Sequence, residues 1–113
     1  MFRAWREKRY ARSTARRLLA LHAETRARHP ELSGKALYRE ILLHSPGIDS
    51  SRVDQILLQA EHSFDEWSER DAESLSFRQV VTYIVMSQYL ESGRQGTVVS
   101  FKDVVFAVVP SDL

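Results

Sequence analysis

The chain contains no cysteine, and it has no long hydrophobic run. Without thiols it can form no disulfide, no zinc or iron–sulfur site with thiolate ligands, and no cysteine nucleophile. Its longest apolar stretch, residues 80–86, is interrupted by Thr82 and falls far short of the roughly 20 residues that cross a bilayer. We therefore expect no transmembrane segment, and we expect a cytoplasmic location.

Signatures of catalysis are also absent from the sequence. There is no GxSxG elbow for a serine nucleophile. Carboxylates cluster only within residues 54–73, without the apolar pocket that would separate their proton affinities. His62 and Glu66 have helical spacing near other acids, but one such pair does not make a metal site. We expect no enzymatic activity, no cofactor and no metal.

The remaining composition is that of an ordinary folded domain. The 113 residues are 43% hydrophobic and 27% charged, well away from the hydrophobe-poor composition of disordered chains. A chain of this length can bury one core and is short for two. Residues 1–113 are therefore expected to form a single domain.

Charge is distributed very unevenly along the chain, although the formal net charge is only +1. Residues 1–28 hold nine basic residues and two acids, a net of +7. Residues 29–113 hold seven basic residues and thirteen acids, a net of −6. Such a molecule is strongly dipolar, so its basic and acidic parts either meet each other or meet different partners.

Hydrophobic periodicity and helix-end signals predict an all-α bundle of about five helices. Residues 3–28 contain no glycine or proline and are rich in Ala, Arg and Leu. Apolar residues recur at three- and four-residue steps after residue 50, the clearest amphipathic pattern in the chain. The predicted helices cover residues 3–28, 34–44, 50–70, 77–91 and 101–109.

Cap residues support these boundaries. Ser33 suits the start of the second helix, and Asp49 or Ser50 suits the start of the third. Ser76 with Gln79 forms a capping box before the fourth, and Ser100 with Asp103 repeats that pattern before the fifth. The fourth helix has no polar face, so we expect it at the centre of the bundle. The valine-rich residues 97–109 could instead pair as a hairpin, but they lack the glycine or asparagine that tight turns prefer.

Two surfaces are the candidate binding sites. At 100° per residue, one side of the first helix gathers basic and aromatic residues, and the third helix carries a stripe of carboxylates beside its apolar face. The basic set is Phe2, Trp5, Arg9, Arg12 and Arg16, and the acidic set is Asp54, Glu61, Asp65 and Glu69. We interpret them as complementary surfaces that meet within one chain or between copies.

The expected function is a small intracellular protein-interaction or assembly domain, which self-associates into a homo-oligomer through these faces. The alternative is nucleic-acid binding through the first helix, because guanidinium groups pair with phosphate and aromatic rings stack on bases. Protein partners are favoured because the sequence pI is 8.1, below the value of about 9 typical of nucleic-acid-binding domains. Attachment to an anionic membrane surface is a third alternative, weakened by a shallow, alanine-rich apolar face.

Overall fold

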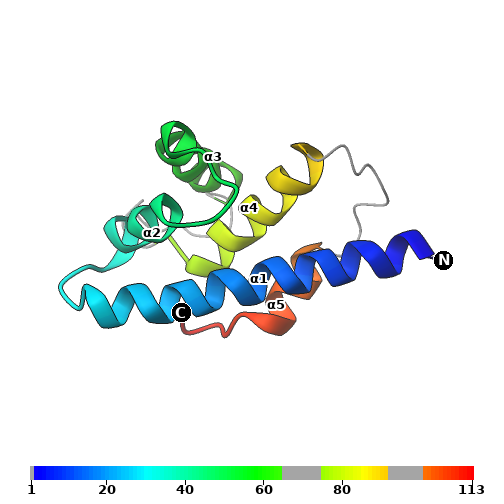
Figure 1. The fold of residues 1–113 in the computed structure, drawn as a ribbon, viewed down its shortest axis with the longest axis horizontal. Coiled ribbons are helices and arrows are strands. Elements are labelled where there is room, and N and C mark those ends of the chain that lie inside the picture. Colours follow the sequence, from blue (N-terminus) through cyan, green and yellow to red (C-terminus); the bar gives the residue numbers. More distant parts are fainter. Residues whose placement is uncertain (1, 65–74, 92–100) are drawn as a thin grey trace.

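A computed structural model of the chain describes residues 2–64, 75–91 and 101–113, with residues 2–4, 63 and 64 described as backbone only. Within these ranges every regular element is helical, and the predicted all-α bundle is confirmed (Figure 1). The elements are α1 (Phe2–Arg28), α2 (Gly34–Leu43), the short 3-10 helix η1 (Ser50–Arg52), α3 (Val53–Phe64), α4 (Phe77–Glu91) and α5 (Phe101–Val108).

The helix boundaries agree closely with the periodicity of the sequence. The third predicted helix begins as the 3-10 turn η1 and becomes α-helical at Val53, while its predicted last turns, residues 65–70, lie outside the described residues. Phe101–Val108 is a helix and not a hairpin strand. Residues 97–100, the first part of the segment 97–109 for which a hairpin was the alternative, lie outside the described residues.

The predicted caps are observed in part. The Asp49 side chain accepts a hydrogen bond of 3.0 Å from the backbone N–H of Ser51. The Gln79 side chain accepts one of 3.1 Å from the N–H of Ser76, which is one of the two bonds of a capping box, while the N–H of Gln79 donates to the backbone carbonyl of Ser76. Ser100 lies outside the described residues. Ser33 is different, since it precedes α2 but makes no side-chain capping bond. The chain enters α2 through Gly34 at a φ of 56°, so the backbone does not follow the usual path of a capped helix start.

The fourth helix is central, as its composition predicts. It packs against α1, α3 and α5, and its residues Val80, Val81, Ile84 and Val85 are fully buried. Exposure rises at the end of the helix, where 57% of the surface of Leu90 is exposed and Glu91 is exposed as well. The other described helices therefore cover α4 less completely in its last turn.

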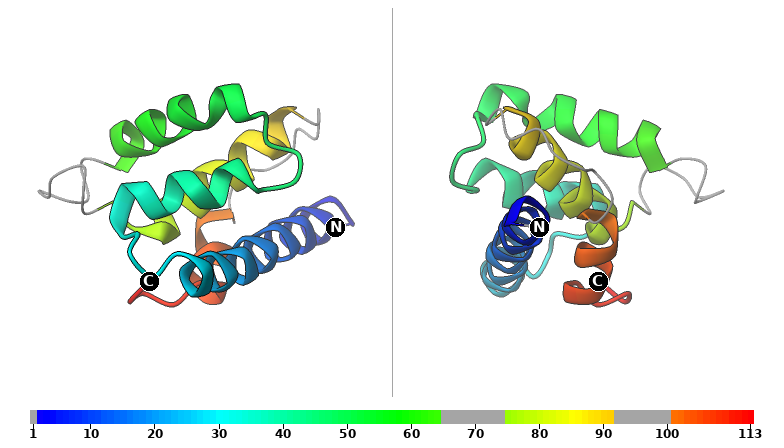
Figure 2. Two further views of the ribbon diagram at one scale, coloured as in Figure 1. Left: turned by 60° about the vertical axis from the view of Figure 1, so that its left-hand side comes forward. Right: turned by 90° about the vertical axis from the view of Figure 1, so that its right-hand side faces the viewer.

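The described helices place α1 and α3 on opposite sides of the bundle (Figure 1). α1 and α5 lie side by side along one edge, and α2 and α4 stand between α1 and α3 (Figures 1 and 2). The N-terminal turns of α1 extend beyond the other described helices (Figure 1). No helix within the described residues is long and apolar enough to cross a membrane.

Candidate functional site

The position of α1 is set by one narrow buried face. Ala11, Ala15 and Leu18 are at most 3% exposed, and their small side chains let the helix approach its neighbours closely. His22 continues this face, with its ring centre 4.4 Å from that of the buried Phe77. Because this face points into the bundle, the side chains on the opposite side of α1 point to solvent.

The outward side of α1 carries the predicted basic set. Trp5, Arg9, Arg12 and Arg16 are all exposed, and we call these four residues the basic row. Among the described residues no carboxylate lies within ion-pair distance of these three arginines. The side chain of Phe2, the fifth predicted residue, lies outside the description, although its backbone belongs to α1.

Arg9 makes a contact with an aromatic ring instead of with an acid. Its guanidinium carbon lies 5.2 Å from the centre of the Trp5 ring, one helical turn away. This cation–π contact leaves the charge of Arg9 uncompensated. The exposed fraction of Trp5 is 58%, the largest value among the large hydrophobic residues of the described chain.

Further cations flank the basic row without neutralising acids. Arg6 and Lys8 are exposed and have no ion pair in the described part of the chain. Arg17 donates a hydrogen bond of 3.4 Å to the hydroxyl of Thr14, a neutral group. Among the described residues, a cation of α1 is paired with an acid only towards the end of the helix, where Arg28 lies 3.6 Å from Glu24. The first two-thirds of α1 therefore presents a continuous surplus of positive charge.

The acidic stripe of α3 has partners on α2. Arg39 donates a hydrogen bond of 2.9 Å to Asp54, and this contact lowers the pKa of the Asp54 carboxyl. The ammonium group of Lys35 lies 2.5 Å from Oε1 of Glu61, an oxygen that is fully covered. Asp65 and Glu69, the other predicted members of the stripe, lie outside the described residues.

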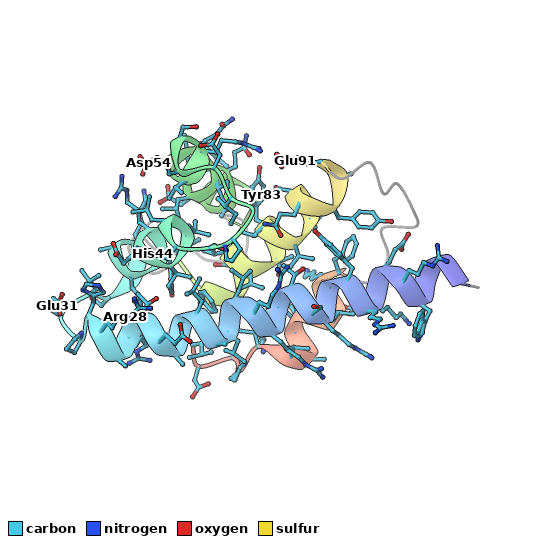
Figure 3. The ribbon with its side chains drawn as sticks, in the orientation of Figure 1. Arg28, Glu31, His44, Asp54, Tyr83 and Glu91 are labelled. Carbon is cyan, nitrogen blue, oxygen red and sulfur yellow. The ribbon has the colours of Figure 1, made fainter. Side chains whose placement is uncertain are left out.

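The structure does not bring the basic row to Asp54 or Glu61 within one chain. The two carboxylates are matched by Lys35 and Arg39, which the sequence analysis did not assign to any site. Asp54 lies at the edge of the molecule opposite to α1 (Figure 3). For Asp54 and Glu61 the described cations are those of α2, which packs against α3. A meeting of the basic and acidic sets between copies stays a prediction.

A buried acid within α1 was missed by the sequence analysis. Glu7 is 4% exposed, and its carboxylate accepts a hydrogen bond of 2.8 Å from the hydroxyl of Tyr89 on α4. A signal was present, because Glu7 falls on the same helical face as Ala11 and Leu18. An acid that is alone among arginines and on the apolar face is better explained by a specific buried partner than by solvent.

A shallow depression borders another side of α1. It is lined by Tyr10 and Arg17 of α1, by Pro46 and Gly47 of the loop after α2, and by Gln88 and Glu91 of α4. Gly47 has a φ of 82°, which is strained for other residues and lets the loop turn sharply here. Glu91 is paired with Arg52. The cation of this depression is Arg17, whose described hydrogen bond goes to a neutral hydroxyl and not to an acid.

The described residues hold no group of three or more histidine, aspartate or glutamate side chains placed to bind a metal ion. Comparisons of the chain with models of protein families, with curated proteins and with solved structures give no match.

Proposed function

We propose that this protein is a non-catalytic binding domain that holds nucleic acid through the basic row of α1. The observation that carries the proposal is the absence of ionic partners for Arg9, Arg12 and Arg16 among the described residues. Guanidinium groups without carboxylate partners are free to pair with phosphate oxygens, often through two parallel hydrogen bonds.

The length of the basic row suits a phosphate backbone. At a rise of about 1.5 Å per residue, Arg9 and Arg16 are separated by about 10 Å along the helix axis. Phosphates in one strand of a duplex advance by about 3.4 Å each, so the row spans about three of them. Arg6 and Lys8 extend the positive surface towards the N-terminus.

The positions of the described acids on α3 favour nucleic-acid binding at α1, although the net charge of the chain is low. A net charge of +1 and a pI of 8.1 would disfavour phosphate binding if the acidic stripe lay beside α1, because the carboxylates would then repel the phosphates. Asp54 and Glu61 belong instead to α3, which lies on the other side of α2 and α4 from α1 (Figure 1), and each is paired with a cation of α2. Because charges separated by more than about 10 Å are largely screened at 0.1 M salt, they repel a phosphate at α1 only weakly.

Salt-dependent binding tests this proposal. We expect a labelled 15-nucleotide DNA to bind at 50 mM KCl and to be released as KCl is raised, with a logarithmic slope of about −0.7 to −0.9 per phosphate neutralised. The triple variant R9Q/R12Q/R16Q should lose about two to three units of this slope. K35Q/R39Q/R52Q is the matched control, because it removes the same charge from cations that are already paired with acids. Equal losses in the two variants, or no binding at 50 mM KCl, would contradict the proposal.

A second candidate function is self-association, which one pair of exposed apolar residues favours. Leu58 is 51% exposed on α3 and lies one turn from both Asp54 and Glu61, as Trp5 lies one turn from Arg9. The surface of α1 thus combines an exposed apolar side chain with positive charge, and the surface of α3 combines one with negative charge. Because the two surfaces lie on different sides of one chain, α1 of one copy would bind α3 of the next.

Charge reversal tests the second candidate. Reversing Arg9, Arg12 and Arg16 should weaken an oligomer, and reversing Asp54, Glu61 and Asp65 in the same protein should partly restore it. Sedimentation velocity measures the oligomeric state of each variant, and a monomer at every workable concentration would rule this function out. For either function we propose a cytoplasmic location, with which the lack of cysteine is compatible.

A further inference from the structure

The exposure of Trp5 is the starting point for a narrower conclusion about the ligand. A tryptophan with 58% of its surface in water contributes little to the core, and the hydrophobic effect favours covering it. Trp5 lies in the N-terminal part of α1, which extends beyond the other described helices (Figure 1). None of these helices is therefore placed to cover it.

The contact between Trp5 and Arg9 covers at most one face of the indole ring. The guanidinium carbon lies 5.2 Å from the ring centre, and the residue as a whole is 58% exposed. A large part of the flat aromatic side chain is therefore accessible to a ligand. Arg9 belongs to the same row as Arg12 and Arg16, so an apolar platform and a line of cations occupy one surface.

We propose that Trp5 is a base-stacking platform and that the ligand of α1 is a single strand of nucleic acid. This inference rests on the proposed function and makes it more specific. The bases of a duplex are stacked on one another and offer no free face to an aromatic side chain, whereas unpaired bases do. A single strand can place a base on Trp5 and its following phosphates on Arg9, Arg12 and Arg16, whose axial steps are about 4.5 and 6 Å.

Trp5 itself can report on the contact. The chain has two tryptophans, Trp5 and Trp67, so W67F leaves Trp5 as the sole indole fluorophore. We expect a 15-nucleotide oligothymidylate to quench its fluorescence, and a 15-base-pair duplex of mixed sequence to quench it much less. Vesicles of anionic lipid serve as a third probe. A blue shift with vesicles and no quenching by the oligonucleotide would overturn the inference in favour of a membrane surface.

Affinity measurements on variants of Trp5 provide a second test of base stacking. W5A should weaken binding of the single strand about 5- to 150-fold, the range expected for the loss of one stacked base. Binding of the duplex should change little, and W5F should retain most of the single-strand affinity. L58A is the matched control, since it removes an exposed apolar side chain from the far side of the molecule and should change neither affinity. Circular dichroism checks that each variant folds.

The outcomes separate this inference from the proposed function. If single strand and duplex bind equally, with W5A changing neither or both to the same extent, stacking on Trp5 is ruled out while phosphate binding by the basic row stands. If neither DNA binds at 50 mM KCl, both proposals fail. A selective loss of single-strand binding in W5A, with W5F and L58A intact, supports the stacking platform.

Discussion

The hydroxyl of Tyr89 donates a hydrogen bond of 2.8 Å to the carboxylate of Glu7, joining residues that are 82 positions apart in the chain. Both side chains are buried, so the bond ties α1 to the central helix α4 from inside the bundle. The same contact fixes the rotation of α1 about its axis. With Glu7 facing inward, the basic row must face outward.

Removal of this hydrogen bond should destabilise the protein. In Y89F the Glu7 carboxylate loses its described donor while it remains buried, and a buried charged group without a partner costs about 1–3 kcal/mol or more. We expect Y89F to lower the free energy of unfolding in urea by at least about 1 kcal/mol. Y83F is the control, since Tyr83 is only half-buried on the same helix.

A double-mutant cycle with E7Q separates the bond from the packing of the two side chains. A coupling energy of about 0.5–3 kcal/mol is expected for residues in direct contact. Additive effects of Y89F and E7Q would show that the hydrogen bond does not hold α1 in place.

Stability should fall as the pH is lowered, because of His22. Burial, and secondly the nearby Arg26, lower the pKa of His22 below its usual 6.5 in the folded state. Below about pH 6.5 the unfolded chain binds a proton at this histidine that the folded chain does not, so acid favours unfolding. Urea unfolding at pH values between 7.5 and 5 measures the effect. H22Q should show a smaller decline than the wild type, and H62Q, which removes an exposed histidine, should not.

Arg78 should be important for the attachment of α5. Its guanidinium group donates hydrogen bonds to the backbone carbonyls of Val109, at 3.0 Å from Nε, and of Phe106, at 3.1 Å. These carbonyls lie at the C-terminal end of α5, where helical partners are lacking. R78Q should cost about 1–3 kcal/mol. Faster amide hydrogen exchange in α5 would locate the loss, and unchanged protection there would contradict this role. A107S, a change at an exposed position of α5, is the control.

Phe77 should be the most sensitive core position. Its side chain is completely buried, and its ring centre lies 4.4 Å from that of His22 and 5.7 Å from that of Tyr38. F77A would open a cavity between α1, α2 and α4 and should cost about 3–5 kcal/mol. F77L should cost clearly less, because it fills most of the volume. If F77A and F77L lowered the stability equally in thermal or urea unfolding, formation of a cavity would not be the cause of the loss.

The sequence was sufficient to predict features that depend on local periodicity. The buried face of α1, with Ala11, Ala15 and Leu18, follows from the helical repeat, as do the boundaries of α4 and the cap at Asp49. These features need no knowledge of what the helices pack against. The exposure of Trp5 beside Arg9 was left open by the sequence, because a helical repeat places the two residues on one side of the helix without showing what covers that side.

Features that depend on tertiary neighbours could not be predicted in this way. The pairing of Asp54 with Arg39 and of Glu61 with Lys35 requires α2 to lie beside α3, which periodicity does not determine. Arg39 and Lys35 are scattered cations in a short helix, and nothing in their spacing distinguishes them from solvated residues. The bond from Tyr89 to Glu7 depends in the same way on the docking of α4 against α1.

The separation of unpaired cations on α1 from the neutralised carboxylates on α3 has a consequence for handling the protein. Binding to an ion-exchange resin depends on the charge of the protein surface that contacts the resin, and not only on the net charge of the protein. A sulfonate resin at neutral pH should therefore retain this chain far longer than another protein of net charge +1, with α1 turned towards the matrix. Because polyanions do not bind a sulfonate resin, retention of the protein on this resin would also separate it from copurifying polyanions.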